Sequence, residues 1–209
     1  MICDRKINRL LKTALIIFVR NPEPGKVKTR LAKTMGDEKA LQVYQQLLIH
    51  TYLITKDMGC DKFIFYADYI VENDLWEKSL FHKKIQQGND LGERMLHAFR
   101  DLFGLGYDCI QIIGSDCIEL TTEIIQTGFD RLSKIDLVIG PSTDGGYYLL
   151  GMNLLIPAVF YKKEWSTEKV YSATLADIKR LSLSYVALPE LPDIDNEADW
   201  INYLTKINH

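Results

Sequence analysis

Cysteine is scarce in this sequence, and long apolar runs are absent. The 209 residues include four cysteines, Cys3, Cys60, Cys109 and Cys117, which show neither C-x-x-C spacing nor the density of a disulfide-stabilised scaffold. We therefore expect free thiols and a reducing, cytoplasmic compartment. No run approaches the roughly 18 apolar residues that a membrane-spanning helix requires, so we expect no integral membrane segment.

An excess of positive charge is also lacking. Lysine and arginine number 25 against 28 aspartates and glutamates, which gives a formal net charge of −3. The chain as a whole therefore has no electrostatic reason to bind nucleic acid, and any anion must be bound by a local group of side chains. The apolar fraction of 47% excludes a mainly disordered chain. The length predicts a single domain spanning 1–209, with its core at about 14–205.

Short apolar segments alternate with helical patterns along the chain. This alternation predicts an α/β fold, in which a mostly parallel sheet is covered by helices on both faces. Ligands of such sheets bind beyond the carboxyl ends of the strands. The predicted strands are 15–19, 63–67, 85–87, 109–113, 137–139, 147–150 and 185–188, and the predicted helices are 37–58, 73–80, 91–103, 122–132 and 165–181, with a last helix capped by Asn196.

A basic segment follows the first predicted strand. Residues 20–33 contain five cations and a single acid, Glu23. Pro22 and Pro24 stiffen the approach, and Gly25 permits a backbone turn whose N–H groups can face an anion. The position after a buried strand predicts a loop that binds a phosphate or diphosphate, although a solvated basic loop has the same composition. The five cations are Arg20, Lys26, Lys28, Arg30 and Lys33.

Carboxylates follow three of the later predicted strands. Asp116 comes after 109–113, Asp144 after 137–139, and Asp193 with Asp195 after 185–188. Because parallel strands end at one edge of a sheet, we expect these acids to converge there. Clustered carboxylates repel one another, and their oxygens favour Mg²⁺ or Mn²⁺ as the compensating cation. Simple turn formation at Asp144 or helix capping near Asp195 remains an alternative for each acid alone.

Six segments together resemble a bacterial glycosyltransferase-like family. That family belongs to the nucleotide-diphospho-sugar transferase group of GT-A fold, with molybdenum cofactor guanylyltransferase and phospholactate guanylyltransferase as more distant relatives. The set is specific because the segments occur in family order over about 14–200, whereas none is specific alone. The segments are PEPGKVKTRL at 22–31, QGNDLGERM at 87–95, GSD at 114–116, DGGYYLLG at 144–151, WST at 165–167 and DID at 193–195.

The resemblance implies a Rossmann-like sheet and a set of site residues. It implies that Asp116 and Asp195 hold the metal and that Gly88 and Gly92 allow close approach to the nucleotide. One departure concerns the metal site: GT-A enzymes commonly show Asp-x-Asp, whereas position 114 here is Gly. The resemblance adds Leu91 and Ser115 on the nucleotide side, and Gly145, Gly146, Tyr147 and Trp165 on the sugar or acceptor side.

These residues predict a metal-dependent transferase that uses a nucleotide-activated donor. Asp144 is the candidate base, since the two following glycines give a ligand room beside it, and Lys28 is the candidate cation that stabilises the leaving group. We favour glycosyl transfer from a nucleotide-diphospho-sugar, a small-molecule donor; the sequence does not identify the acceptor. Nucleotidyl transfer with release of pyrophosphate is the first alternative, and a non-catalytic nucleotide-binding module is the second.

Overall fold

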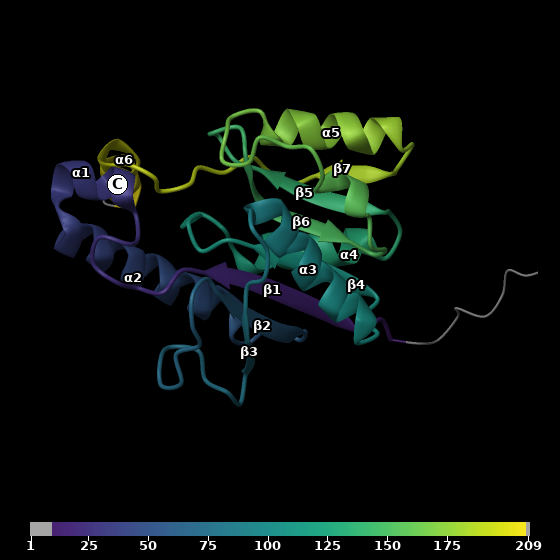
Figure 1. The fold of residues 1–209 in the computed structure, drawn as a ribbon, viewed down its shortest axis with the longest axis horizontal. Coiled ribbons are helices and arrows are strands. Elements are labelled where there is room, and N and C mark those ends of the chain that lie inside the picture. Colours follow the sequence, from purple (N-terminus) through teal and green to yellow (C-terminus); the bar gives the residue numbers. More distant parts are fainter. Residues whose placement is uncertain (1–9, 208–209) are drawn as a thin grey trace, which may run out of the picture.

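Seven strands form one sheet in the computed structural model, which describes residues 10–207 (Figure 1). The strand order is β3-β2-β1-β4-β6-β5-β7, and only β6 runs antiparallel to its neighbours. The predicted mostly parallel α/β sheet is therefore confirmed. The strands are β1 (Thr13–Val19), β2 (Asp61–Tyr66), β3 (Phe81–Ile85), β4 (Cys109–Ile113), β5 (Leu137–Pro141), β6 (Tyr147–Met152) and β7 (Tyr185–Ala187).

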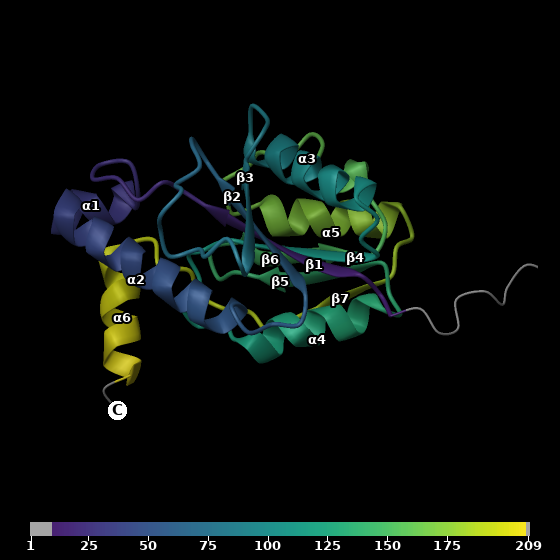
Figure 2. The same ribbon diagram turned by 90° about the horizontal axis from the view of Figure 1, so that it is seen from below.

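Helices cover both faces of the sheet, as the turned view in Figure 2 shows. Helices α3 and α5 pack on one face, α2 and α4 pack on the other, and α6 lies beside α1 (Figure 2). The helices are α1 (Thr29–Met35), α2 (Asp37–Thr55), α3 (Leu91–Gly104), α4 (Thr122–Leu132), α5 (Val170–Arg180) and α6 (Glu197–Ile207), with a short 3₁₀ turn at Pro157–Val159.

The central strands are apolar because both of their faces are covered. In β1, Leu15 and Ile17 belong to one buried cluster, while Ala14 and Ile16 belong to the cluster on the opposite face. All five residues of β4 are buried. Alternating contacts with two layers of helices explain the continuous apolar runs from which these strands were predicted.

Four predicted elements differ from the observed ones. The strand predicted at 85–87 lies earlier in the chain, at Phe81–Ile85, so only Ile85 is shared. The predicted helix at 73–80 is a series of bends and turns, because the Asp74 carboxylate accepts the backbone N–H of Trp76 and offers the chain a bond that competes with the helix. The predicted helix from Trp165 begins only at Val170, since Ser166 takes a left-handed conformation with φ of 63°. The predicted basic loop is helical from Thr29 onwards.

The expectations of free thiols and of no membrane-spanning helix can be compared with the structure of residues 10–207. Cys60 and Cys117 carry free thiols, whereas Cys3 lies outside the described residues. None of the helices between residues 10 and 207 combines the length and the apolar composition needed to cross a membrane.

Candidate functional site

A cleft of about 1270 Å³ opens at the edge of the sheet where the parallel strands end. Arg20 follows β1, Asp68 lies beyond β2, and Asp116 lies beyond β4, and all three line this cleft. Because β6 runs in the opposite direction, its first residue, Tyr147, reaches the same edge. The cleft is therefore at the position expected for the ligand site of an open α/β sheet.

Most of the predicted site residues line this cleft, although four glycines do not. Gly25, Gly88, Gly92 and Gly145 lie outside the lining. The predicted residues that the fold brings together are Arg20, Lys26, Lys28, Arg30, Leu91, Ser115, Asp116, Asp144, Gly146, Tyr147, Trp165 and Asp195.

Lys28 connects the basic segment to the acidic residues directly. Its Nζ lies 2.7 Å from Oδ1 of Asp116 and 3.5 Å from Oδ1 of Asp195. Nη1 of Arg30 lies 3.3 Å from Oδ2 of Asp195. Two cations of the predicted phosphate-binding loop are therefore bonded directly to two of the predicted acids. The cation that compensates the carboxylates in this structure is therefore a lysine of the chain.

The conformation of Lys28 is unusual for a lysine. Its φ and ψ of 47° and 46° are left-handed, at the position immediately before α1. A residue with a Cβ adopts this conformation only where its surroundings compensate the strain, and such positions cluster at functional sites. The side chain is only 6% exposed and is held by the carboxylates of Asp116 and Asp195, which supplies that compensation.

Asp193 is the most strongly perturbed acid of the cleft. Burial, followed by the charges of Asp116 and Asp144, raises the pKa of Asp193 to about 7, although Lys28 opposes the shift. For Lys28, burial lowers the pKa, but the charges of Asp116, Asp195 and Asp193 outweigh it and the net shift is upward. The lysine thus stays charged, whereas Asp193 is poised to gain a proton near neutrality.

Tyr44 of α2 fixes the position of two cleft segments. Its buried hydroxyl accepts the backbone N–H of Arg20 at 2.8 Å and also lies 3.3 Å from Oγ of Ser115. The turn after β1 and the turn after β4 are therefore held to one atom. Tyr44 was not among the predicted site residues, because helical spacing does not reveal where a tyrosine hydroxyl points.

Asp144 is held in place by the turn between β5 and β6. Its Oδ1 accepts hydrogen bonds from the Ser142 hydroxyl and from the backbone N–H of Gly146, the latter at 2.9 Å. The predicted open space beside Asp144 is only partly present. A Cβ on Gly145 would collide with the backbone of Glu168, and the φ of Gly145 is 87°, so this glycine is needed by the turn itself.

Gly88 and Gly92 permit close approaches within the protein. A Cβ on Gly92 would collide with the indole of Trp165, and one on Gly88 would lie 2.7 Å from Cβ of Glu93. Trp165 can therefore pack on the first turn of α3 only because position 92 is glycine. The close approach to a nucleotide that the resemblance implied for these glycines stays a prediction, since neither lines the cleft.

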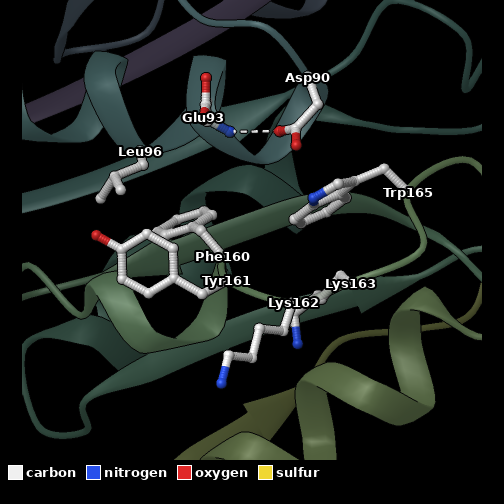
Figure 3. Close-up of a pocket in the computed structure, with 8 residues that line it drawn as sticks. All are labelled: Asp90, Glu93, Leu96, Phe160, Tyr161, Lys162, Lys163 and Trp165. Atoms are coloured by element: carbon white, nitrogen blue, oxygen red, sulfur yellow. Dashed lines mark hydrogen bonds between the residues drawn. The ribbon is translucent and has the colours of Figure 1, made fainter.

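A second, smaller pocket of about 250 Å³ adjoins the cleft. Figure 3 shows Trp165 on one side of this pocket and the rings of Phe160 and Tyr161 on the other. Trp165 also lines the main cleft, so its ring forms a partition between the two spaces. Nζ of Lys163, whose side chain is 1% exposed, is paired with Oδ2 of Asp177 at 2.6 Å and is not available to a ligand.

The acidic residues suit a metal ion that is only partly bound by protein. Within residues 10–207, no group of three or more histidine, cysteine or acidic side chains is arranged to hold a metal. Asp116 and Asp195 nevertheless converge on one cation, the Lys28 ammonium, and their side chains are 48% and 33% exposed. Two carboxylates that line the cleft fit Mg²⁺, which commonly takes one or two carboxylates and completes its shell with water and substrate phosphates.

Comparisons with known proteins support the same fold. Residues 49–167 match the protein family described as "Uncharacterized protein conserved in bacteria (DUF2064)". No curated protein matches the sequence. A solved structure from Desulfovibrio desulfuricans G20, provisionally named a nucleotide-diphospho-sugar transferase, is 34% identical with a TM-score of 0.87, and the match covers 95% of this chain and 88% of that one.

Two more distant structures share the fold alone. One is CMP:2-keto-3-deoxy-manno-octonic acid synthetase complexed with CTP, at 10% identity and a TM-score of 0.58, with 95% of this chain and 100% of that one covered. The other is a manganese complex of a Mycobacterium tuberculosis H37Rv protein, at 9% identity and a TM-score of 0.54, with 94% and 99% covered. The chain belongs to the bacterial DUF2064 family and has the fold of the nucleotide-diphospho-sugar transferases.

Proposed function

We propose that the protein is a metal-dependent glycosyltransferase that uses a nucleotide-diphospho-sugar as its donor. The observation that carries this proposal is the contact of Lys28 with Asp116 and Asp195 in a cleft at the carboxyl edge of the sheet. Cations and carboxylates side by side are what a metal-bound diphosphate requires. The 34% identical relative, provisionally named a nucleotide-diphospho-sugar transferase, supports the same class of donor.

The basic segment is proposed to bind the diphosphate. Arg20 and Lys26 line the cleft, and Ser115 offers a hydroxyl at its floor. A Mg²⁺ or Mn²⁺ ion held by Asp116 and Asp195 would neutralise phosphate charge and act as a Lewis acid. Lys28 and Arg30, which bond these two carboxylates in the free protein, would gain phosphate oxygens as additional acceptors and so stabilise the leaving group.

Asp144 is proposed as the general base. Its Oδ1 is occupied by the Ser142 hydroxyl and the Gly146 N–H, while Oδ2 has no bond to another residue between 10 and 207. That oxygen can therefore accept the proton of an acceptor hydroxyl. Gly146, Tyr147 and Trp165 line the same cleft and would contact the sugar or the acceptor, while Leu91 would lie on the nucleotide side.

Nucleotidyl transfer is the alternative activity of the same site. The fold is shared with CMP:2-keto-3-deoxy-manno-octonic acid synthetase, which was solved with CTP. In that reaction an acceptor attacks the α-phosphorus, and Lys28 with Arg30 would stabilise departing pyrophosphate. The products distinguish the two activities, because sugar transfer releases a nucleoside diphosphate and nucleotidyl transfer releases pyrophosphate.

A ligand screen followed by product analysis tests the proposal. Thermal shift with nucleotides and sugar nucleotides, each with Mg²⁺ or Mn²⁺, identifies the donor because a ligand of the folded state raises the melting temperature. Asp116→Asn is expected to abolish the metal-dependent part of the shift while the protein stays folded. Binding without turnover of any sugar nucleotide or triphosphate would favour a non-catalytic module, and an unchanged shift in the variant would remove Asp116 from the site.

A further inference from the structure

Arg94 is a cation of the cleft that the proposed function does not use; Arg20 and Lys169 line the cleft as well. Arg94 lies on α3, is half-buried, and lines the cleft. Its Nε donates to the carbonyl oxygen of Gly88 at 3.1 Å. Within residues 10–207 its guanidinium forms no ion pair, in contrast to Lys26, Lys28 and Arg30, which are all paired with acids. The two terminal nitrogens of Arg94 are therefore uncommitted donors.

Between residues 10 and 207, neither of the two acids beside Arg94 at the start of α3 forms an ion pair with it. The Asp90 carboxylate accepts the backbone N–H of Glu93 and caps α3. The Glu93 carboxylate in turn accepts both the backbone and the side-chain N–H groups of Asn89. The two neighbouring acids of this helix end are thus occupied by local bonds. A half-buried guanidinium without a carboxylate partner is suited to an oxyanion from outside the protein.

The backbone around Gly88 holds the guanidinium in a defined orientation. Gly88 has φ of 139°, and its α-carbon lies so close to α3 that a Cβ would be 2.8 Å from the backbone nitrogen of Arg94. This approach brings the Gly88 carbonyl to Nε of Arg94. One edge of the guanidinium is fixed by the protein, and the planar fork of its other nitrogens remains for a ligand.

Arg94 belongs to the opposite wall of the cleft from the aspartates. Lys28 precedes α1 and Asp195 precedes α6, and these helices pack with the cluster on one face of the sheet. Arg94 lies on α3, which packs with the cluster on the other face (Figure 2). The cleft volume of about 1270 Å³ exceeds the 300–1,000 Å³ of a typical ligand pocket, so it has room for more than a single diphosphate.

We propose that Arg94 forms a second anion subsite, which binds a phosphate or carboxylate group of the ligand on the wall opposite Asp116 and Asp195. The inference rests on the proposed function, in which the aspartate wall takes the metal-bound diphosphate of a nucleotide-activated donor. The second oxyanion is carried by the acceptor or by the transferred group, or it is part of the donor's own phosphate chain. All three share the chemistry that an arginine fork recognises.

Titration of the full-length protein with inorganic phosphate, followed by ³¹P nuclear magnetic resonance, tests the subsite. We expect Arg94→Met to weaken phosphate binding by about tenfold or more, and Arg94→Lys to bind with intermediate affinity because it keeps the charge but loses the fork. Arg100→Met is the matched control, since Arg100 is an exposed residue of the same helix outside the cleft. If Arg94→Met does not fold, Arg94→Lys against Arg100→Lys gives the same comparison.

The proposal is overturned if wild-type protein binds no phosphate beyond a chloride control of equal ionic strength. It is also overturned if Arg94→Met retains wild-type affinity, or if Arg100→Met loses as much affinity as Arg94→Met. Phosphate binding that depends on Arg94 and not on Arg100 supports it.

Pyrophosphate with Mg²⁺ separates this inference from the proposed function. We expect its binding to be lost in Asp116→Asn. Arg94→Met retains it in full if Arg94 binds the acceptor or the transferred group, and weakens it without abolishing it if Arg94 binds the donor's phosphate chain. Failure of wild-type protein to bind it would contradict the proposed function alone, while the phosphate result decides Arg94. Simultaneous binding of phosphate and Mg²⁺-pyrophosphate assigns the second anion to the acceptor or the transferred group, and displacement assigns it to the donor's phosphate chain.

Discussion

The Lys28 ammonium is buried against Asp116, with Nζ 2.7 Å from Oδ1. The Lys28 side chain is only 6% exposed, whereas the Asp116 side chain is 48% exposed and opens onto the cleft. The lysine thus supports the carboxylate from the protein side and leaves its other face to a ligand. Asp116 and Asp195 are kept close together by a cation that is part of the fold. The free protein can therefore hold two neighbouring acids in position before any metal binds.

Removal of that cation is expected to destabilise the protein. Lys28→Met leaves Asp116 without its cation and Asp195 with Arg30 alone. We expect a loss of about 1–3 kcal/mol in the free energy of unfolding, less than for a fully buried pair because the acids are partly exposed. Urea denaturation of the variant measures this loss. Lys26→Met is the matched control, since Lys26 is 65% exposed and pairs only with Glu23. Equal stability of the two variants would contradict a supporting role for Lys28.

The stability of the metal-free protein is expected to fall as pH rises from about 4 to above 7. Asp193 keeps its proton up to about pH 7 in the folded state, because burial and the charges of Asp116 and Asp144 raise its pKa, whereas an unfolded aspartate ionises near pH 4. In this window the folded state binds the additional proton, so stability declines as the pH passes through it. The full effect is on the order of 2–4 kcal/mol.

Asp193→Asn isolates this contribution. Denaturation of the variant and of the wild type at pH 5.5 and pH 8 gives the difference, which is expected to be smaller in the variant because its side chain does not ionise. Parallel losses of stability in both proteins would show that other groups cause the pH dependence.

Gly92→Ala tests the packing of Trp165 on α3. The added Cβ would collide with the Trp165 indole, so we expect destabilisation of about 1–3 kcal/mol together with a changed tryptophan emission. Gly104→Ala is the matched control, because Gly104 ends the same helix and a Cβ there would meet nothing within 4 Å. The control is expected to be neutral or slightly stabilising. Unchanged emission and stability in the Gly92→Ala variant would contradict the contact.

Asp144→Asn is expected to separate catalysis from binding. Loss of a general base lowers kcat by about 10² to 10⁴-fold, whereas the affinity for the nucleotide should change little because the diphosphate residues are unaltered. Ser142→Ala removes the hydroxyl that donates to Asp144 and is expected to cause a smaller decrease in kcat. Steady-state kinetics with the donor found by the screen measure both. A wild-type kcat in Asp144→Asn would assign the base to another residue.

Much of the fold could be predicted because a strand covered on both faces is apolar along its whole length. The strand predicted at 109–113 coincides with β4, whose residues are apolar since both faces are covered. The helix predicted at 122–132 coincides with α4, and Thr121 caps it because its hydroxyl accepts the N–H of Ile124. The antiparallel direction of β6 was not predicted, since strand direction depends on pairing between distant segments.

The candidate site was predictable in its location but not in its contacts. Acids that follow parallel strands share an edge, which correctly placed Asp116, Asp144 and Asp195 around one cleft. The bond between Lys28 and Asp116 could not be foreseen, because it depends on how the segment before α1 turns back onto the sheet. Arg94 was also missed, since a charged residue on a helix is usually a solvated one.

Because β6 runs antiparallel to β5, the two strands form a hairpin whose turn lines the cleft. Ser142, Asp144 and Tyr147 reach the cleft within a single tight turn, without an intervening helix. A residue inserted in this turn would move the acid and the aromatic ring together, whereas an insertion after Met152, at the far edge of the sheet, would leave both in place. Under the proposed function, changes in the length of this hairpin would alter the acceptor side of the cleft and leave the basic segment before α1 as it is.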